Sequence, residues 1–211
     1  MSFVQELSQL LPDDLPNREQ CIAAAARHLE LIVETNQYFN LTRILNPREA
    51  AIKHVLDSVL PWRLFAGAKH VADAGSGAGF PGIPLSLVLP DTQFTLLDST
   101  QKKAAFIAAT VETLQLPNVT VLPDRAEAYL ANHQVDIITA RAVAPITRAI
   151  PLFAPALRKG ARLLLYKGPD AENEILEAKR EPKNVKWKMQ VVFQYELPDA
   201  MGSRSIIQIT K

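Results

Sequence analysis

The sequence has little cysteine and no long apolar segment. Cys21 is its only cysteine, which excludes an internal disulfide and a cysteine-based metal cluster. No apolar run approaches the roughly 20 residues that a helix needs to cross a bilayer. The first 16 residues do not combine a basic segment, an apolar core and a cleavage site as a secretory signal does. These absences predict a cytoplasmic protein with no membrane segment.

The sequence also lacks an excess of charge of one sign. Its 23 Lys and Arg residues nearly balance its 22 Asp and Glu residues, for a formal net charge of +1. A strongly basic chain would indicate a nucleic-acid partner, whereas this balance neither indicates nor excludes one. The 211 residues, 48% of them hydrophobic and 21% charged, are typical of one globular domain with a small appendage.

The first part of the chain shows a helical pattern. The spacing of apolar residues predicts a helix over about 17–38, with Asn17 and Gln20 as a reciprocal capping pair at its start. A second helix is expected after Asn46, because the proline that follows suits the first helical position. We therefore expect an N-terminal helical cap over residues 1–65.

Residues 66–211 have a different rhythm, in which short apolar runs alternate with helical stretches. Such alternation predicts a mostly parallel sheet with crossover helices. The last two runs are too close for a helix between them, so they form a hairpin with one antiparallel strand. The seven runs are HVADAG, FTLLD, VTVLP, VDIITA, RLLLYK, MQVVFQYELP and RSIIQITK.

The expected architecture is therefore an α/β domain with a mostly parallel seven-stranded sheet and an antiparallel C-terminal strand. Five parallel strands followed by a hairpin is the arrangement of the Rossmann-like class I methyltransferases, which use S-adenosylmethionine (AdoMet). This is an analogy at the level of the fold, and the function has to be argued from the site.

A glycine-rich turn, VADAGSGAGFPG, contains the first of these strands and the residues after it. Gly77, Gly79 and Gly82 fit the G-x-G-x-x-G pattern of dinucleotide sites. The same stretch also fits D-x-G-x-G-x-G, the pattern of AdoMet sites. Asp98 ends the next strand, 23 residues after Gly75, where a carboxylate can accept hydrogen bonds from ribose hydroxyls. Both ligands contain that ribose, so Asp98 agrees with either.

Asp73, at the head of the second pattern, favours AdoMet. Its carboxylate would lie unfavourably close to a dinucleotide diphosphate, a group that suits a helix N-terminus. In the other interpretation it faces the cationic amino group and sulfonium of AdoMet. A turn without any ligand is the weakest interpretation, because each glycine costs chain entropy on folding. The local chemistry favours AdoMet and leaves a dinucleotide open.

The stretch around Arg141, at the end of the fourth parallel strand, limits the methyl acceptor. Pyrimidine C5 methylation needs a thiolate, but Cys21 lies far away in the helical cap. Methylation of an exocyclic amine commonly uses an N/D-P-P-Y/F turn, where this chain has TARAVAP. A purine N7 needs neither device, because its lone pair carries no proton and transfer mainly requires alignment. Arginine can stack on a base, bind a phosphate or donate to guanine O6.

Seven blocks of sequence together resemble a known family. They are NLT at 40–42, HVLDS at 54–58, DAGSGAGFPGIPL at 73–85, LLDSTQKKAAF at 96–106, DRAE at 124–127, ITARAVA at 138–144 and YKG at 166–168. In this order they resemble the bacterial 16S ribosomal RNA guanine-N7 methyltransferase G family, also called glucose-inhibited division protein B. The resemblance covers nearly all of the chain after residue 30. The chain departs from it at Thr35, near a position where the family often has tryptophan, and at Ser205, where many members have histidine.

The resemblance implies that AdoMet is the cofactor, that no metal takes part, and that the partner is 16S ribosomal RNA within the small subunit. It implies that Arg141 is the catalytic residue, lying beside the methyl donor and positioning the guanine. Nothing in the sequence demands more than a monomer. The residues implied to bind the cofactor are Asp73, Gly75, Ser76, Gly77, Gly79, Phe80, Pro81, Asp98, Ser99, Ala126, Glu127 and Arg141. Those implied to bind RNA or support the pocket are Asn40, Thr42, Arg43, His54, Asp57, Lys102, Lys103, Lys167 and Arg204.

Some of these residues also have plainer interpretations. His54, Asp57 and Ser58 lie opposite the apolar stripe of the second helix, and most such faces are only solvated. Lys53 and Asp57 would then form an ordinary i, i+4 pair. Glu127 fits a D-x-x-E capping pattern as well as a cofactor site.

Three other functions remain open. They are a small-molecule methyltransferase, a nicotinamide-dependent oxidoreductase, and an RNA-binding assembly factor that keeps AdoMet only as a relic. The polar cap with Arg43 and Lys53 favours an acceptor larger than a metabolite. Asp73 disfavours the oxidoreductase. The intact Asp98 and Arg141 disfavour an assembly factor that no longer uses AdoMet.

Overall fold

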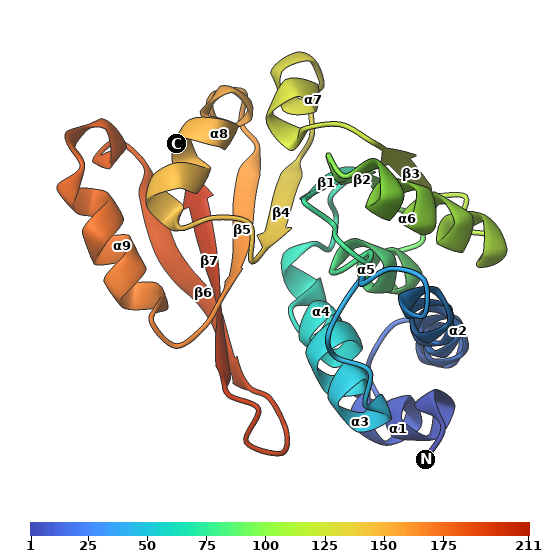
Figure 1. The fold of residues 1–211 in the computed structure, drawn as a ribbon. Coiled ribbons are helices and arrows are strands. Elements are labelled where there is room, and N and C mark those ends of the chain that lie inside the picture. The colour runs from blue at the N-terminus through green and yellow to red at the C-terminus, as the bar shows by residue number, and fades with distance from the viewer.

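The computed structural model describes residues 1–211 and contains one seven-stranded sheet (Figure 1). Its strand order is β3-β2-β1-β4-β5-β7-β6, and only β7 runs against the others. The prediction of a mostly parallel sheet with one antiparallel C-terminal strand is confirmed. The strands are β1 (His70–Ala74), β2 (Gln93–Leu97), β3 (Val119–Leu122), β4 (Ile137–Arg141), β5 (Arg162–Lys167), β6 (Lys188–Glu196) and β7 (Ser203–Thr210).

Both faces of the sheet are covered, because successive strand residues point to opposite sides. Val71 and Leu96 belong to a cluster of 30 buried residues on one face, and their neighbours Ala72 and Leu97 to a cluster of 25 on the other. The first face is packed by α5 (Gly82–Val88) and α6 (Gln101–Thr113). The second is packed by α7 (Ala126–Asn132), α8 (Ile146–Arg158) and α9 (Ala171–Arg180), which the short η3 (Pro182–Asn184) follows.

The N-terminal helices form a further layer beside α5 (Figure 1). Buried residues of this layer, such as Leu7, Leu29 and Val55, belong to the same hydrophobic cluster as strand residue Val71. The layer consists of α1 (Phe3–Leu10), α2 (Arg18–Asn36), α3 (Pro47–Ala50), the π-helix η1 (Ala51–Leu56), α4 (Asp57–Val59) and the 3-10 helix η2 (Trp62–Leu64). No helix of the protein is long and apolar enough to span a bilayer.

The capping predictions have mixed outcomes. Asn46 caps α3 as expected, because its side chain accepts a hydrogen bond from the Glu49 main-chain N–H. Asn17 does not cap α2 with its side chain. It adopts a left-handed conformation (φ 53°), and the expected reciprocal pair is wrong. Helix α1, whose capping box joins Ser2 and Gln5, was not expected.

The segment from α3 to α4 corrects a second expectation. The face that carries His54, Asp57 and Ser58 is buried rather than solvated, and these residues are 7%, 3% and 0% exposed. Lys53 pairs with Glu49 at 2.7 Å and not with Asp57. The reason is tertiary contact: His54 stacks on Phe80 of the glycine turn, the Tyr166 hydroxyl of β5 donates to Ser58 O, and the Tyr195 hydroxyl of β6 donates to Asp57.

The β6–β7 hairpin is tied to this helical layer at its tip. Asp199, in the turn between the two strands, forms an ion pair with Arg48 of α3 at 2.8 Å. Arg48 also pairs at 3.0 Å with Glu6, a buried residue of α1. The hairpin therefore reaches from the edge of the sheet to the helical layer (Figure 1).

Candidate active site

The glycine turn connects β1 to α5 at the carboxyl edge of the sheet. Gly75, Gly77 and Gly79 have φ values of +74°, +62° and +98°, which glycine adopts without strain. The main-chain N–H groups of Gly75 and Ser76 both donate to Leu97 O at the end of β2, at 2.8 and 3.1 Å. The turn is therefore held against the neighbouring strand with part of its backbone exposed to a pocket.

That pocket, the cofactor pocket, has a volume of about 370 Å³. It lies at the carboxyl ends of the central strands, where open α/β sheets bind their ligands. Five residues expected at a cofactor site line it together: Gly75, Asp98, Ser99, Ala126 and Glu127. The rest of the lining is Ala74, Leu97, Thr100, Lys103, Asp124, Arg125, Val143, Leu152 and Phe153.

Asp98 is oriented by the turn itself. Its Oδ2 atom accepts a hydrogen bond from the Gly77 N–H at 2.9 Å, and its Oδ1 atom accepts one from the Thr100 N–H at 2.8 Å. Each carboxylate oxygen has a second lone pair, so both can still accept from a hydroxyl. The position at the end of β2 thus fits the two hydroxyls of a ribose.

Glu127 lines the pocket at the first turn of α7. The capping interpretation of this residue is wrong, since Arg125 occupies the N-cap position and no side chain caps the helix. Glu127 has only a long ion pair of 3.7 Å with Arg125. Its carboxylate is consequently available at the pocket rim.

Asp73 lies beneath the turn and does not line the pocket. It is fully buried, and its Oδ2 atom accepts a hydrogen bond from the Gly82 N–H at 3.0 Å. Its Oδ1 atom has no partner, and burial raises the pKa of this carboxyl to about 7. Asp73 therefore holds the start of α5. Its carboxylate is not exposed in the pocket, where it is expected from the sequence to face the amino group and sulfonium of AdoMet.

Phe80 lies between two histidines. Its ring centroid is 4.7 Å from that of His28 and 4.6 Å from that of His54, so the glycine turn is stacked into the helical layer. The Phe80–Pro81 peptide is cis. Burial lowers the pKa of His28 to about 4 and that of His54 to about 3, so both rings are neutral near pH 7. Sequence reasoning missed His28, which sits in α2 among apolar neighbours with no motif around it.

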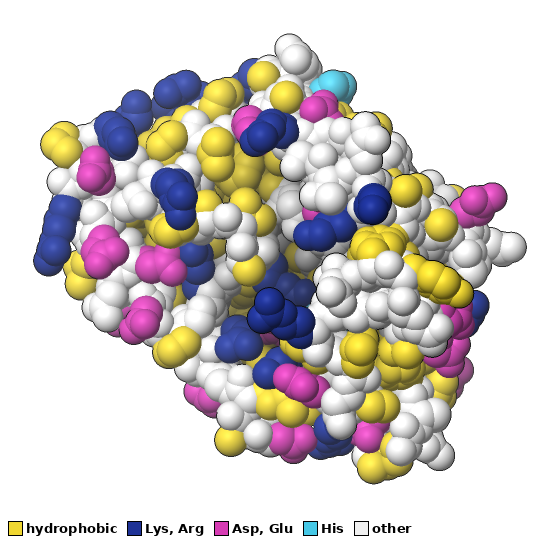
Figure 2. All heavy atoms as spheres, viewed as in Figure 1, with side chains coloured by type: hydrophobic (Ala, Val, Ile, Leu, Met, Phe, Trp, Pro, Cys, Tyr) yellow, Lys and Arg dark blue, Asp and Glu magenta, His cyan; other side chains and the backbone are white.

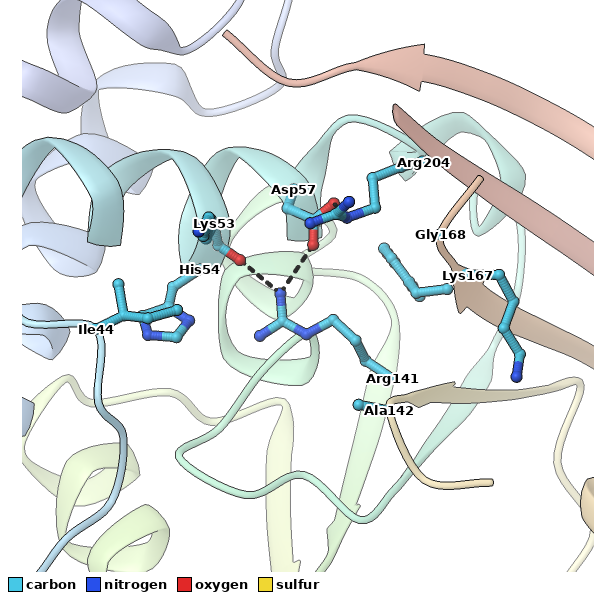
Figure 3. A pocket seen from close by; sticks show the side chains of 10 residues that line it. Ile44, Lys53, His54, Asp57, Arg141, Ala142, Lys167, Gly168 and Arg204 are labelled. Atoms are coloured by element: carbon cyan, nitrogen blue, oxygen red, sulfur yellow. Dashed lines mark hydrogen bonds and ion pairs between the residues drawn. The ribbon is translucent and has the colours of Figure 1, made fainter. Parts of the chain in front are cut away.

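A second pocket, the acceptor pocket, adjoins the cofactor pocket and has a volume of about 440 Å³. It lies between the helical layer and the ends of β4, β5 and β7 (Figure 3). Figure 2 shows several Lys and Arg side chains gathered in a hollow near the centre of the view. The lining residues are Ile44, Lys53, His54, Asp57, Arg141, Ala142, Tyr166, Lys167, Gly168 and Arg204.

The acceptor pocket brings together four of the residues expected on the RNA side, which are His54, Asp57, Lys167 and Arg204. Thr42 supports the pocket from outside, since its Oγ1 atom is 3.2 Å from His54 Nε2. Lys103 lies in the cofactor pocket instead. Three others, Asn40, Arg43 and Lys102, are exposed and line neither pocket.

The buried carboxylate of Asp57 organises the centre of the acceptor pocket. Arg141 Nη1 donates to Asp57 Oδ2 at 3.2 Å and to Lys53 O at 2.8 Å (Figure 3). Arg204 Nε lies 3.5 Å from Asp57 Oδ1, and the Tyr195 hydroxyl donates to that same oxygen at 2.8 Å. Sequence reasoning did not find Tyr195, because only the pairing of β6 with β7 brings it opposite Arg204.

Lys167 is held away from this centre. Its Nζ atom donates to Ala144 O at 2.9 Å and to Glu174 of α9 at 2.7 Å. In Figure 3 its side chain points away from Arg141. Lys167 therefore fixes the loop after β4, and its charge is balanced by Glu174.

The two pockets meet at three consecutive residues. Arg141 and Ala142 line the acceptor pocket, and Val143 lines the cofactor pocket. Ala142 turns the chain between them with a φ of +56°. Of these three residues only Arg141 carries a charge, and it lies where the two pockets meet.

The sheet order, the glycine turn and the paired pockets define a Rossmann-like methyltransferase of the class that uses AdoMet. The family model described as rRNA small subunit methyltransferase G matches residues 21–204, and the chain belongs to that family. Ribosomal RNA small subunit methyltransferase G of Solibacter usitatus is 66% identical over 209 residues, covering 99% of this chain and 100% of the relative. The protein of the same name from Carboxydothermus hydrogenoformans is 36% identical, over 88% of this chain and 81% of its own.

Solved structures agree on the fold. A precorrin-6y C5,15-methyltransferase from Geobacter metallireducens superimposes with a TM-score of 0.58 at 14% identity. The match covers 83% of this chain and 95% of the other. The identity is too low to carry function, so this likeness concerns the architecture.

Proposed function

We propose that the protein transfers the methyl group of AdoMet to N7 of a guanine in small-subunit (16S) ribosomal RNA. The single observation that carries this proposal is the meeting of the two pockets at Arg141. One pocket places the Asp98 carboxylate beside the glycine turn, as binding of AdoMet would require, and the other is lined by Lys53, Arg141, Lys167 and Arg204. Membership in the methyltransferase G family supports the choice of acceptor.

The cofactor side rests on the turn between β1 and α5. Asp98 would accept hydrogen bonds from the ribose hydroxyls, while Ala126 and Glu127 would border the adenine. Gly75 and Gly77 present backbone without side chains, which allows close approach. Bound AdoMet supplies an electrophilic methyl group. Ser76, Gly79, Phe80, Pro81 and Asp73 would act from below by holding the turn in shape.

The acceptor side needs orientation rather than proton transfer. Guanine N7 carries no proton, so no general base has to remove one, and catalysis comes from holding the base in line with the methyl group. Neutral, buried His54 suits a wall of the pocket. Arg141 would position the guanine by stacking or by donating to O6.

The RNA substrate must place an unstacked base in this pocket. Unstacking costs a few kcal/mol, which a loop or single strand reduces. Arg204, Lys53 and Arg43 lie in or near the acceptor pocket and would contact phosphates beside the target. We propose that the substrate is the assembled small subunit and that the enzyme acts as a monomer in the cytoplasm. We also propose that residues 1–65 form a cap on a methyltransferase domain of residues 66–211.

The test uses small subunits and naked 16S RNA from cells that lack the enzyme. Each is incubated with the protein and methyl-labelled AdoMet, and the labelled base is mapped. Label at N7 of one guanine is expected. Absence of label in either RNA would contradict the proposal, label at another atom would contradict the mechanism, and label only in naked RNA would contradict the choice of particle.

A further inference from the structure

Tyr195 is the only side chain that reaches the Asp57 carboxylate without carrying charge. It lies on β6, directly opposite Arg204 of β7 in the strand register. Its hydroxyl is 2.8 Å from Asp57 Oδ1 and 3.0 Å from Asp57 main-chain O. A phenol has one proton to donate, and both nearby atoms are acceptors, so this proton is shared within one residue.

The state of Tyr195 is fixed by its surroundings. Burial, and then the nearby Asp57 carboxylate, raise the pKa of its phenol well above its ordinary value. The hydroxyl is therefore a donor at every physiological pH. A donor that contacts both the side chain and the main chain of Asp57 restricts rotation of the carboxylate about its own bond.

That restriction reaches Arg141 through the other carboxylate oxygen. Asp57 Oδ1 accepts a hydrogen bond from Tyr195 and pairs with Arg204, and both of these residues lie in the hairpin. Asp57 Oδ2 accepts a hydrogen bond from Arg141 of β4. If Oδ1 is fixed, the position of Oδ2 is fixed as well. The Arg141 guanidinium then keeps its orientation at the junction of the two pockets.

We propose that Tyr195 is a positioning residue for methyl transfer, which acts by fixing the Asp57 carboxylate and through it the Arg141 guanidinium. This inference rests on the proposed role of Arg141. It assigns to the β6–β7 hairpin a part in the reaction that neither the glycine turn nor the pocket-lining cations provide.

The first experiment compares Tyr195→Phe with the wild type on the same RNA substrate. We expect kcat to fall about tenfold or more, because losing a hydrogen bond to a charged group disturbs the orientation of a reacting pair. The Kd for AdoMet should be unchanged, since Tyr195 lines no part of the cofactor pocket. An unchanged kcat would overturn the inference.

Asp199→Asn is the matched control. It weakens the ion pair with Arg48 and so loosens the same hairpin at its tip, without touching Asp57. Its kcat should stay within about twofold of the wild type, as expected for an exposed ion pair. If Asp199→Asn lowers kcat as much as Tyr195→Phe, the effect comes from docking of the hairpin and the inference is wrong.

A double-mutant cycle separates action through Asp57 from an independent effect. In the Asp57→Asn background, adding Tyr195→Phe should lower kcat little further. Fully multiplicative effects would contradict the inference. NMR of the Arg141 side-chain N–H signals gives a readout without turnover, with a shift expected in Tyr195→Phe and none in Asp199→Asn.

The two proposals fail in different ways. If the wild type places no label in RNA, the proposed function fails, and the NMR comparison still tests the link from Tyr195 to Arg141. If the wild type labels RNA and Tyr195→Phe labels it equally fast, only the positioning role fails.

Discussion

Val143 covers Gly75: its Cγ2 atom lies 2.8 Å from the point that a Cβ atom on Gly75 would occupy. The contact joins the loop after β4 to the glycine turn after β1. It leaves no room for a side chain where the cofactor pocket begins. Gly75 is required here for two reasons, its positive φ and this close approach.

Gly75→Ala is expected to lower both stability and AdoMet affinity. The left-handed conformation costs an L-residue about 1–2 kcal/mol, and the displaced Val143 would disturb the pocket wall. Gly67→Ala is the matched control, because Gly67 has a φ of +80° and no atom within 4 Å of its Cβ position. Thermal unfolding and calorimetric titration with AdoMet measure the two effects. Equal affinity in both variants would contradict the role of the contact.

Asp98→Ala should weaken AdoMet binding more than it lowers the rate of methyl transfer. The variant loses the proposed acceptor for the ribose and two hydrogen bonds, from the Gly77 and Thr100 N–H groups, so we expect Kd to rise at least about tenfold. At saturating AdoMet, kcat should recover most of its value. Equilibrium titration and steady-state kinetics provide the measurements.

Asp136→Ala controls for the structural part of that effect. Its carboxylate also accepts two main-chain hydrogen bonds, from Lys69 and His70, but at the opposite edge of the sheet. It should lose stability and keep the wild-type Kd. A similar loss of affinity would show that Asp98 acts only through the fold.

Arg141→Ala should abolish transfer and leave AdoMet binding intact. Asp57 keeps Tyr195 and Arg204 as partners, so the buried carboxylate does not become unpaired. We expect kcat to fall about a hundredfold or more, the size of effect that loss of orientation produces. Arg63→Ala, which removes an exposed cation paired with Asp14, should behave as the wild type. Equal loss of AdoMet binding in Arg141→Ala would mean that its assigned role is wrong.

His28 should make stability depend on pH below neutrality. Its pKa is about 4 in the folded protein against an ordinary 6.5, so the unfolded chain binds more protons between these values. Its contribution is complete above about pH 6.5 and is lost as pH falls toward 4. From pH 7 to pH 5 the loss is about 2 kcal/mol.

Asp73 has the opposite effect in this range, because burial raises the pKa of its carboxyl to about 7 and the folded state binds the extra proton. The His28 contribution is therefore isolated by comparison with His28→Gln. Denaturant unfolding of both proteins at pH 7 and pH 5 measures the difference. The difference in unfolding free energy between wild type and His28→Gln should be about 2 kcal/mol smaller at pH 5 than at pH 7. An equal difference at the two pH values would contradict the lowered pKa of His28.

Much of the fold was predictable from local patterns. All seven apolar runs became strands, because each is short, rich in β-branched or aliphatic residues and bounded by turn signals. The cofactor pocket was predictable for a related reason: Gly75 and Asp98 follow adjacent strands, and the carboxyl ends of parallel strands meet at one edge.

The centre of the acceptor pocket was harder to predict. Asp57 resembles an ordinary surface residue on an amphipathic helix, and Tyr195 an ordinary residue on an edge strand. Their contact joins positions 138 residues apart and depends on how the β6–β7 hairpin is placed against the helical layer. The spacing of residues within one helix or strand cannot predict a contact of this kind.

The segment Arg141–Val143 has a consequence for any attempt to change what the enzyme methylates. Two neighbouring peptide bonds separate Arg141, which lines the acceptor pocket, from Val143, which covers Gly75. Replacing this loop to admit a new acceptor would also move Val143 relative to Gly75. If the two pockets have the proposed roles, this segment links the choice of acceptor to the affinity for the donor, and a redesigned loop has to satisfy both pockets at once.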